Sequence, residues 1–205
     1  MTQTVDTETF LLDENEQDAL FRAARSARTF SDEPVTDETI ESVYDLVRWG
    51  PTALNTVPLR LLLVRTPEAR AALAGHMGEG NRERVLAAPL SIVVAADTDF
   101  HERLDTLMPH LPGVGQSFAA NAEHRTAMAR DNAWLQTGYL LVGLRAAGLD
   151  VGPMNGMDAA AIDADLLAGT TWRSLVVLNV GYPAADNGAF PRAPRLAFDE
   201  ASTVI

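Results

Sequence analysis

The pattern of hydrophobic and polar positions predicts helices that alternate with short buried strands. Continuous apolar runs of this length are typical of buried strands, and three occur, "LRLLLV" (59–64), "LSIVVAA" (90–96) and "SLVVLNVGY" (174–182). Apolar residues at helical spacing predict helices over 14–28, 37–49, 67–77, 81–87, 130–147 and 158–169. The interleaving indicates an α/β or α+β fold with a small sheet covered by helices. Two helices precede the first strand, which is not the order of a dinucleotide-binding fold.

The helix over 130–147 is the strongest helical prediction. Leu135, Tyr139, Val142 and Leu144 lie among apolar neighbours on nearly every face. A helix of this kind is normally buried inside a domain or in a subunit interface. By contrast, the stretch 97–115 shows no regular period and is expected to be a loop.

Composition and charge limit the class of protein. The chain has 205 residues, of which 47% are hydrophobic, and this suits one compact domain. No apolar run approaches the roughly 18 residues of a membrane span. The acidic N-terminal stretch lacks the order of a signal peptide, so a cytoplasmic location is expected. The net charge of -12 argues against nucleic acid or an anionic membrane as a partner.

Two residue types are absent from the sequence. Without cysteine there are no disulfides, thiolate nucleophiles or iron–sulfur ligands. All 16 basic residues are arginines, so Schiff-base chemistry and a P-loop lysine are excluded as well. The four histidines show no metal-ligand spacing, and no metal site is expected. No serine lies in a recognisable nucleophile elbow.

Arginines gather at both ends of the chain. Arg25, Ser26 and Arg28 supply two guanidinium groups and a hydroxyl within four residues, and Arg192 and Arg195 follow in "FPRAPR". Planar guanidinium donors suit a phosphate group, because they can bind two oxygens at once. The alternative interpretation of the N-terminal cluster is a solvated helix end.

Two loops could approach a flat ligand closely. In "WGPTALNTVP" (49–58), Asn55 can donate and accept hydrogen bonds at the edge of a heterocycle. In "GLDVGPMNGMD" (148–158), a Gly-Pro-Met-Asn-Gly run exposes backbone groups. The alternative for both is an ordinary connecting loop.

The order of these pieces resembles the nitroreductase family of FMN-dependent oxidoreductases. The matching segments are Arg25–Arg28, Pro51–Pro58, Ala88–Pro89, Gly152–Gly156 and Arg192. The resemblance covers residue 17 onward and implies a tail (1–16) and a single FMN-binding domain (17–205). It also implies an α+β fold with a small, mainly antiparallel central sheet flanked by helices. In the family, a C-terminal extension is exchanged in a homodimer.

The same resemblance implies a set of FMN contacts and names no catalytic residue. The phosphate would be bound by Arg25, Ser26, Arg28, Arg192 and Arg195. The ring system would be contacted by Pro51, Thr52, Asn55, Asn81, Pro153, Met154, Asn155 and Gly156. Val57 replaces a glutamine common in the family, and Phe190 replaces a common basic residue.

Within the family, stretches such as "FHERLDTLMPH" and "RAAGLDVGPMNGMD" are similar to the malonic semialdehyde reductases of pyrimidine degradation. This likeness implies reduction of malonic semialdehyde to 3-hydroxypropionate by NADH or NADPH, with ping-pong hydride transfer through flavin N5. His101, Arg103 and His110 are candidates for binding the substrate carboxylate. Three alternatives remain: a nitroaromatic, quinone or enal reductase, a non-catalytic flavin-binding protein, and a phosphosugar-binding or hydrolytic domain without flavin.

Overall fold

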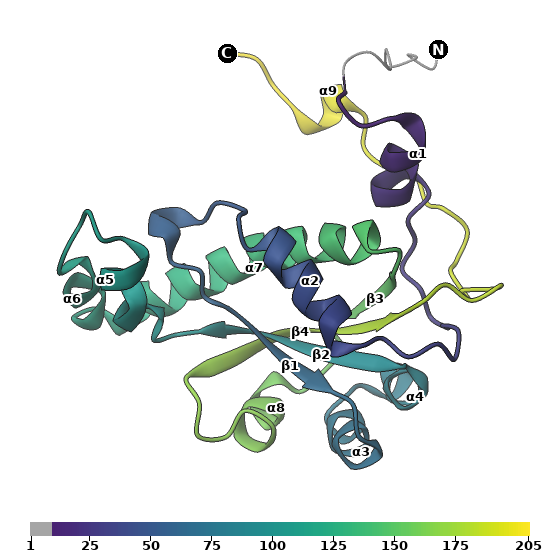
Figure 1. Ribbon diagram of the computed structural model, residues 1–205, viewed down its shortest axis with the longest axis horizontal. Helices are drawn as coiled ribbons and strands as arrows, with labels where there is room; N and C mark the ends of the chain where they lie inside the picture. The colour runs from purple at the N-terminus through teal and green to yellow at the C-terminus, as the bar shows by residue number, and fades with distance from the viewer. Residues whose placement is uncertain (1–9) are drawn as a thin grey trace.

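A small antiparallel sheet lies at the centre of the molecule in the computed structural model, which describes residues 10–205 (Figure 1). Within this part of the chain the sheet has four strands in the order β1-β2-β4-β3, and each pairing is antiparallel. The strands are β1 (Leu59–Val64), β2 (Leu90–Asp97), β3 (Asp150–Met154) and β4 (Trp172–Gly181). The predicted fold class, a small and mainly antiparallel sheet flanked by helices, is therefore confirmed.

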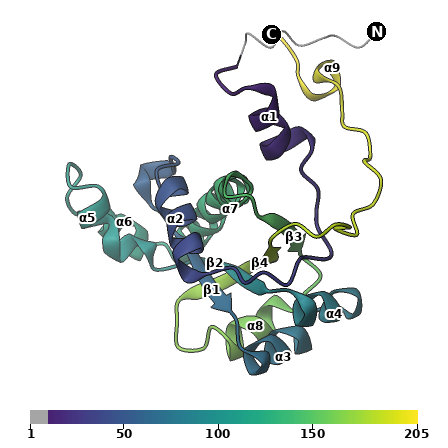
Figure 2. The same cartoon turned by 45° about the vertical axis from the view of Figure 1, so that its right-hand side comes forward.

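Helices cover both faces of the sheet. Figures 1 and 2 show α2 and α7 over one face, and α3, α4 and α8 over the other. The helical segments are α1 (Glu14–Gln17), η2 (Asp18–Arg22), α2 (Asp37–Val47), η3 (Ala53–Asn55), α3 (Pro67–Gly75), α4 (Glu79–Ala87), η4 (Phe100–Arg103), α5 (Leu104–Leu107), α6 (Val114–Ala119), α7 (Ala122–Ala146), α8 (Ala159–Asp165) and α9 (Phe198–Ala201). None of the helices in the described chain is long and apolar enough to cross a membrane.

Strand β2 forms the centre of the core, and all of its residues are buried. Successive side chains of a strand point to opposite faces. Accordingly, Ile92 and Val94 pack with the cluster under α2 and α7, whereas Val93 packs with the cluster under α3, α4 and α8. A strand buried on both faces reads as a continuous apolar run, which explains why its sequence predicted it so directly.

Strand β3 was not predicted, because the sequence interpretation placed a loop over 148–158. Gly152 and Pro153 disfavour a strand interior, but β3 is an edge strand, where proline is tolerated. On its other side β3 meets Ser26 in an isolated parallel bridge, and Ala27 N–H donates to the Val151 carbonyl at 3.0 Å. The predicted helix over 14–28 is therefore too long. The observed helical segment ends at Arg22, and the chain is extended where it pairs with β3.

The two largest of the remaining differences from the sequence prediction concern α7 and the stretch 97–115. Helix α7 begins at Ala122 rather than at 130, because Asn121 caps it by accepting the His124 N–H at 3.0 Å. The expected loop over 97–115 contains η4, α5 and the start of α6. Phe100 and Phe118 are buried there in a third apolar cluster, which holds these short helices together.

The two ends of the described chain lie outside the layered body. Both views place α1 and α9 on the same side of the molecule, away from the sheet (Figures 1 and 2). Leu196, Phe198, Val204 and Ile205 are exposed along the C-terminal segment. The expected exchange of this segment in a dimer stays a prediction. Most of the proposed 1–16 tail, residues 1–9, lies outside the described residues, and α1 begins within its remainder.

Gly143 permits the close packing of α7 on α2. A Cβ atom at Gly143 would lie 2.3 Å from Cγ1 of Val47, a stiff side chain that cannot turn away. We expect Gly143→Ala to lower the free energy of unfolding by about 1–3 kcal/mol, because overpacking outweighs the better helix propensity of alanine. Urea unfolding monitored by circular dichroism would measure this change.

Gly138 provides the matched control on the same helix. A Cβ atom there would meet nothing within 4 Å, so Gly138→Ala should stabilise the protein by up to about 1 kcal/mol. Equal stability changes in the two variants would contradict the packing argument.

Candidate functional site

The N-terminal and C-terminal segments meet at a pocket rich in arginine. It has a volume of about 260 Å³ and is lined by Ala24, Arg25, Ser26, Arg145, Ala189, Phe190, Pro191, Arg192, Ala193 and Arg195. Two hydrogen bonds join the segments: Arg25 Nη2 donates to the Phe190 carbonyl, and Arg192 Nη2 donates to the Ala24 carbonyl at 3.0 Å. The pocket therefore contains Arg25, Ser26, Arg192 and Arg195 of the predicted phosphate set.

Four guanidinium groups line this pocket, and no carboxylate is among its lining residues. Each guanidinium carries five N–H donors, so most of them remain available after the contacts to backbone carbonyls. Four like charges repel one another in the absence of an anion. The pocket is thus suited to an anionic group with several acceptor oxygens, such as a phosphate.

Arg145 is the member of the pocket that the sequence interpretation missed. It lies near the end of α7, is partly buried, and donates to the Leu20 carbonyl at 3.1 Å. Burial lowers the pKa of Arg145, and the nearby Asp150 carboxylate opposes this shift. The sequence feature that could have identified Arg145 is its position as a charged residue in an otherwise apolar helical stretch.

Arg28 is not among the residues that line this pocket. Its guanidinium carbon lies 5.0 Å from the centre of the Phe190 ring, in a cation–π contact. Arg84 lies close by, and its pKa is lowered first by burial and then by repulsion from Arg28. Arg84 donates to the Ala27 carbonyl and to Asn81 Oδ1, both at 3.2 Å. It therefore connects the N-terminal segment to α4.

The second predicted loop, at the end of β3, continues this region. Asn81 Nδ2 donates to the Gly156 carbonyl at 3.1 Å. A Cβ atom at Gly152 would lie 2.3 Å from the Ala27 carbonyl oxygen, so only glycine permits this approach. Pro153, Asn155 and Gly156 are exposed. The side chain of Met154 is buried in the core, which leaves only its backbone for a ligand.

The loop containing Pro51, Thr52 and Asn55 lies away from the arginine pocket. Ala53 N–H donates to Asn132 Oδ1 at 2.7 Å, and Asn55 Nδ2 donates to the Leu107 carbonyl at 2.9 Å. Along α7, Asn132 and Arg145 are separated by about 20 Å at 1.5 Å per residue. One chain therefore does not bring this loop to the arginine pocket.

The backbone of the same loop is strained. Leu54, Asn55 and Val57 have φ values of 51°, 48° and 41°. A positive φ is a true outlier for a β-branched residue such as Val57. Thr52 supports the loop, since its hydroxyl accepts the Val57 N–H at 3.3 Å. Strain of this kind is concentrated at ligand and catalytic sites.

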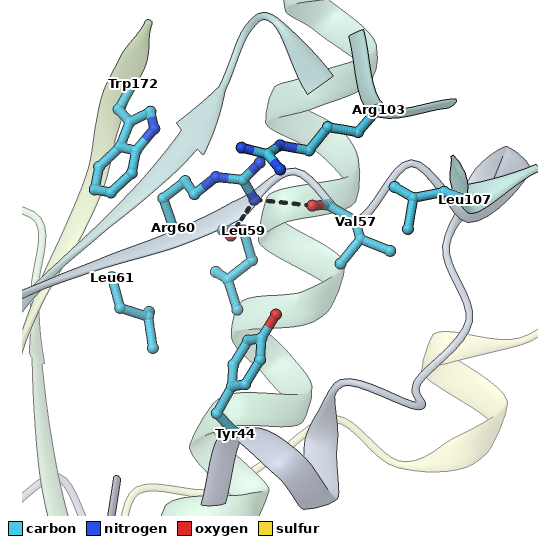
Figure 3. Close-up of a pocket in the computed structure, with 8 residues that line it drawn as sticks. All are labelled: Tyr44, Val57, Leu59, Arg60, Leu61, Arg103, Leu107 and Trp172. Carbon is cyan, nitrogen blue, oxygen red and sulfur yellow. Dashed lines mark hydrogen bonds between the residues drawn. The ribbon is translucent and has the colours of Figure 1, made fainter. Parts of the chain in front are cut away.

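A second pocket opens beside this loop (Figure 3). Its lining residues are Tyr44, Val57, Leu59, Arg60, Leu61, Arg103, Leu107 and Trp172. Arg60 forms an ion pair with Asp97 at 2.7 Å and also donates to the carbonyls of Val57 and Leu59. Among the predicted substrate-binding residues, only Arg103 lines this pocket.

The other two substrate candidates do not line the pocket that contains Arg103. His101 lines a separate pocket with Glu102, and its ring packs edge-on against Phe100. His110 is exposed. The three predicted residues therefore do not share one pocket among the described residues, and their role in substrate binding stays a prediction. Within residues 10–205, no group of three or more His, Cys, Asp or Glu residues is placed to hold a metal ion.

The chain matches a known protein family and curated relatives over most of its length. The family model described as "Nitroreductase family" matches residues 21–182. A Streptomyces coelicolor protein, provisionally named NADH dehydrogenase/NAD(P)H nitroreductase, is 49% identical over 195 residues, which cover 95% of this chain and 98% of the relative.

Two solved structures share the fold. One, from Exiguobacterium sibiricum, is provisionally described as a nitroreductase in complex with FMN; its TM-score is 0.79 at 20% identity, with 91% of this chain and 95% of that chain covered. The other is CLA-ER, described as an enone reductase of gut-bacterial fatty acid saturation; its TM-score is 0.78 at 18% identity, with coverages of 95% and 100%.

The chain belongs to the nitroreductase family. The family and fold class predicted from the sequence are confirmed, and so is the prediction that the chain is an oxidoreductase enzyme. The assignment of individual residues to a cofactor stays a prediction.

Asp97 balances the charge of Arg60, which lines the second pocket. Burial alone would raise the pKa of Asp97, but hydrogen bonds from Thr171 and the Asp99 N–H, together with Arg60, hold it below the ordinary value. The ionised carboxylate therefore stabilises the fold above its ordinary pKa, and this contribution is lost as the pH falls toward the folded-state pKa. Asp97→Asn should lower the free energy of unfolding by about 3 kcal/mol at pH 7, since it leaves Arg60 without a counterion.

Unfolding of Asp97→Asn and the parent protein between pH 3 and pH 8 would test this expectation. The difference in free energy of unfolding between the parent protein and Asp97→Asn should be constant near neutral pH and should become smaller below about pH 4. Asp45→Asn is the control, because the Arg48–Asp45 pair is exposed and worth at most about 1 kcal/mol. A pH-independent difference for Asp97→Asn would refute the charge argument.

Proposed function

We propose that this protein is an FMN-dependent NAD(P)H oxidoreductase that reduces malonic semialdehyde to 3-hydroxypropionate. The observation that carries the flavin assignment is the arginine pocket between the two chain ends. An FMN phosphate carries nearly two negative charges, and this pocket offers four guanidinium groups without a lining carboxylate. The names of the Streptomyces relative and of the FMN-bound structure support the same cofactors.

The residues present fit this cofactor. Arg25, Arg145 and Arg192 would bind the phosphate, with Ser26 as a further hydrogen-bond partner. Gly152 and Gly156 keep side chains away from the end of β3, where Asn81 holds the turn in place. Arg28 would shape the entrance through its contact with Phe190.

A homodimer would complete the site. Pro51, Thr52 and Asn55 belong to the predicted ring contacts, yet they lie about 20 Å along α7 from the arginine pocket in one chain. A second copy can bring its own loop to the pocket, as the family resemblance implies. The exposed apolar residues after Arg195 would then be covered by the partner.

Bound FMN would supply two-electron hydride chemistry between the nicotinamide and the substrate. The chain's own residues would mainly bind and orient, and for this reason no catalytic dyad or triad was expected. The buried amides Asn132 and Gln136 fix the loop before β1, and the Arg84 contacts fix the N-terminal segment. The core elements α7 and α4 thus hold the loop before β1 and the N-terminal segment near Ala27 in place.

A second candidate keeps the cofactor and changes the substrate to a nitroaromatic, a quinone or an enal. The name of the Streptomyces relative favours nitro compounds, and the description of CLA-ER as an enone reductase favours conjugated carbonyls. A non-catalytic flavin-binding role is a further alternative.

Arg25→Ala tests the phosphate assignment. Each charged hydrogen bond contributes about 1.5–3 kcal/mol, so the variant should bind FMN about ten- to a hundredfold more weakly. Riboflavin lacks the phosphate, and its affinity should not change. Quenching of flavin fluorescence on binding measures both dissociation constants.

The control variant is Arg22→Ala, which removes an exposed arginine paired with Asp18 one helical turn earlier. It should bind FMN normally. An equal loss of FMN and riboflavin binding in Arg25→Ala would exclude a specific phosphate contact.

Steady-state kinetics tests the substrate assignment. With NADH or NADPH as donor, kcat/KM should be higher for malonic semialdehyde than for nitrobenzene, menadione or an enal. Parallel double-reciprocal plots are expected, because one product leaves before the second substrate binds. A higher kcat/KM for a nitro compound, quinone or enal would favour the second candidate, and no turnover of any of them would favour the non-catalytic role.

A further inference from the structure

A hydrogen-bonded pair of polar side chains lies in the middle of the apolar sheet. Ser91 of β2 and Asn179 of β4 are direct cross-strand partners, and they are 0% and 1% exposed. The Ser91 hydroxyl donates to Asn179 Oδ1 at 2.7 Å. Two valines at these positions would avoid the cost of removing a hydroxyl and an amide from water. The pair therefore points to a contact that apolar side chains could not make.

Asn179 makes that contact with helix α4. Side chains alternate between the faces of a strand, so Asn179 shares its face with Val177, which packs under α3, α4 and α8. Asn179 Nδ2 donates to the Arg84 carbonyl at 2.8 Å, and the Ala88 N–H donates to the same oxygen at 3.2 Å. Since Ser91 occupies the amide oxygen of Asn179, it orients the amide nitrogen toward α4. The sheet thus holds the last turn of α4 by a polar side chain as well as by apolar packing.

The side chain of Arg84 lies beside the predicted ring contacts. Its Nη1 donates to Asn81 Oδ1 and its Nη2 to the Ala27 carbonyl, both at 3.2 Å. A Cβ atom at Gly152 would lie 3.1 Å from Nη2, so the guanidinium group uses space that a glycine leaves open. Gly152 is the cross-strand partner of Asn179 in β3 and β4. One residue pair of the sheet therefore provides both the anchor for the Arg84 backbone and the room for its side chain.

Electrostatics disfavours this placement of Arg84. Burial and then repulsion from Arg28 lower its pKa. Arg84 takes part in none of the ion pairs among residues 10–205, and in the same part of the chain its Nε is buried without a hydrogen-bond partner. The hydrogen bond from Asn179 offsets this cost, because it fixes the turn of α4 from which the guanidinium group extends.

We propose that Asn179 is a positioning residue of the cofactor site. Through the Arg84 carbonyl it fixes α4, which carries the Arg84 guanidinium group and the amide of Asn81 that holds the turn at Gly156. Asn179 is buried and acts only through these two side chains. The inference rests on the proposed function, and it assigns Asn179 to the ring end of the flavin rather than to the phosphate end.

Asn179→Leu tests this role, because leucine has a similar size and cannot donate to the Arg84 carbonyl. The dissociation constants of FMN and riboflavin should rise by the same factor, about three- to tenfold, since both ligands share the ring end of the site. Arg25→Ala, in contrast, should weaken FMN alone. The visible absorption spectrum of the bound flavin should also shift in Asn179→Leu, because the polar groups beside the ring change position. Quenching of flavin fluorescence measures both dissociation constants.

Val93→Ala is the control for a loss of stability alone. Val93 is fully buried on the same face of the sheet, two residues after Ser91, and its side chain cannot form a hydrogen bond. This variant should unfold at a lower urea concentration and keep both flavin affinities. Asn179→Ser is the second test variant, because its hydroxyl is one bond too short to reach the Arg84 carbonyl. It should weaken both flavins as Asn179→Leu does, and it replaces the leucine variant if that one does not fold.

The outcomes separate this inference from the proposed function. If the parent protein binds FMN and a folded Asn179 variant binds both flavins equally well, the positioning role is overturned and the proposed function stands. An equal loss of flavin binding in Val93→Ala would also overturn it, since any loss of core packing would then have the same effect. A parent protein that binds neither FMN nor riboflavin would refute the proposed function, and this inference with it.

Discussion

The packing of α7 across the sheet is the constraint on which the rest of this structure depends. The helix contacts α2 and three of the strands. Its buried amides, Asn132 and Gln136, accept N–H groups from Ala53 and Leu59, so the helix fixes the loop that leads into β1. A buried amide without a partner costs about 1–3 kcal/mol, and the loop and the helix therefore stabilise each other. Gly143 lets α2 approach closely enough to close the core on this side.

The same helix connects the core to the candidate site. Arg145 lies at its C-terminal end and joins arginines from both ends of the chain in one pocket. In a protein with a net charge of -12, four guanidinium groups without a lining carboxylate form a local field of the opposite sign. Such an arrangement destabilises the empty site by mutual repulsion and favours an anion. The chemistry of the site thus depends on tertiary convergence rather than on any local motif.

Much of the fold could be predicted because β1 and β2 are short apolar runs with clear ends, and helix caps such as Thr36 are local. Strand β3 could not, because the Gly152–Pro153 pair is unfavourable in a strand and is tolerated here only at an edge. The gathering of arginines at both ends of the chain already pointed to Arg192 and Arg195 for the site, and the resemblance assigned them to the FMN phosphate. The same pattern pointed to Arg28, which the structure places against Phe190 outside the lining of the pocket.

The sequence by itself determined the alternation of helices and strands and the restriction of basic chemistry to arginine, which follow from local spacing and composition. It also indicated the family, through the resemblance of its ordered segments to known members. Only the tertiary structure decided which arginines share a pocket, that Asn81 holds the turn at Gly156, and that Arg103 lines a pocket with Arg60 and without His101 or His110. The physical reason is that contacts between residues far apart in the chain depend on strand pairing and helix packing, and neither can be read from the spacing of residues along the sequence.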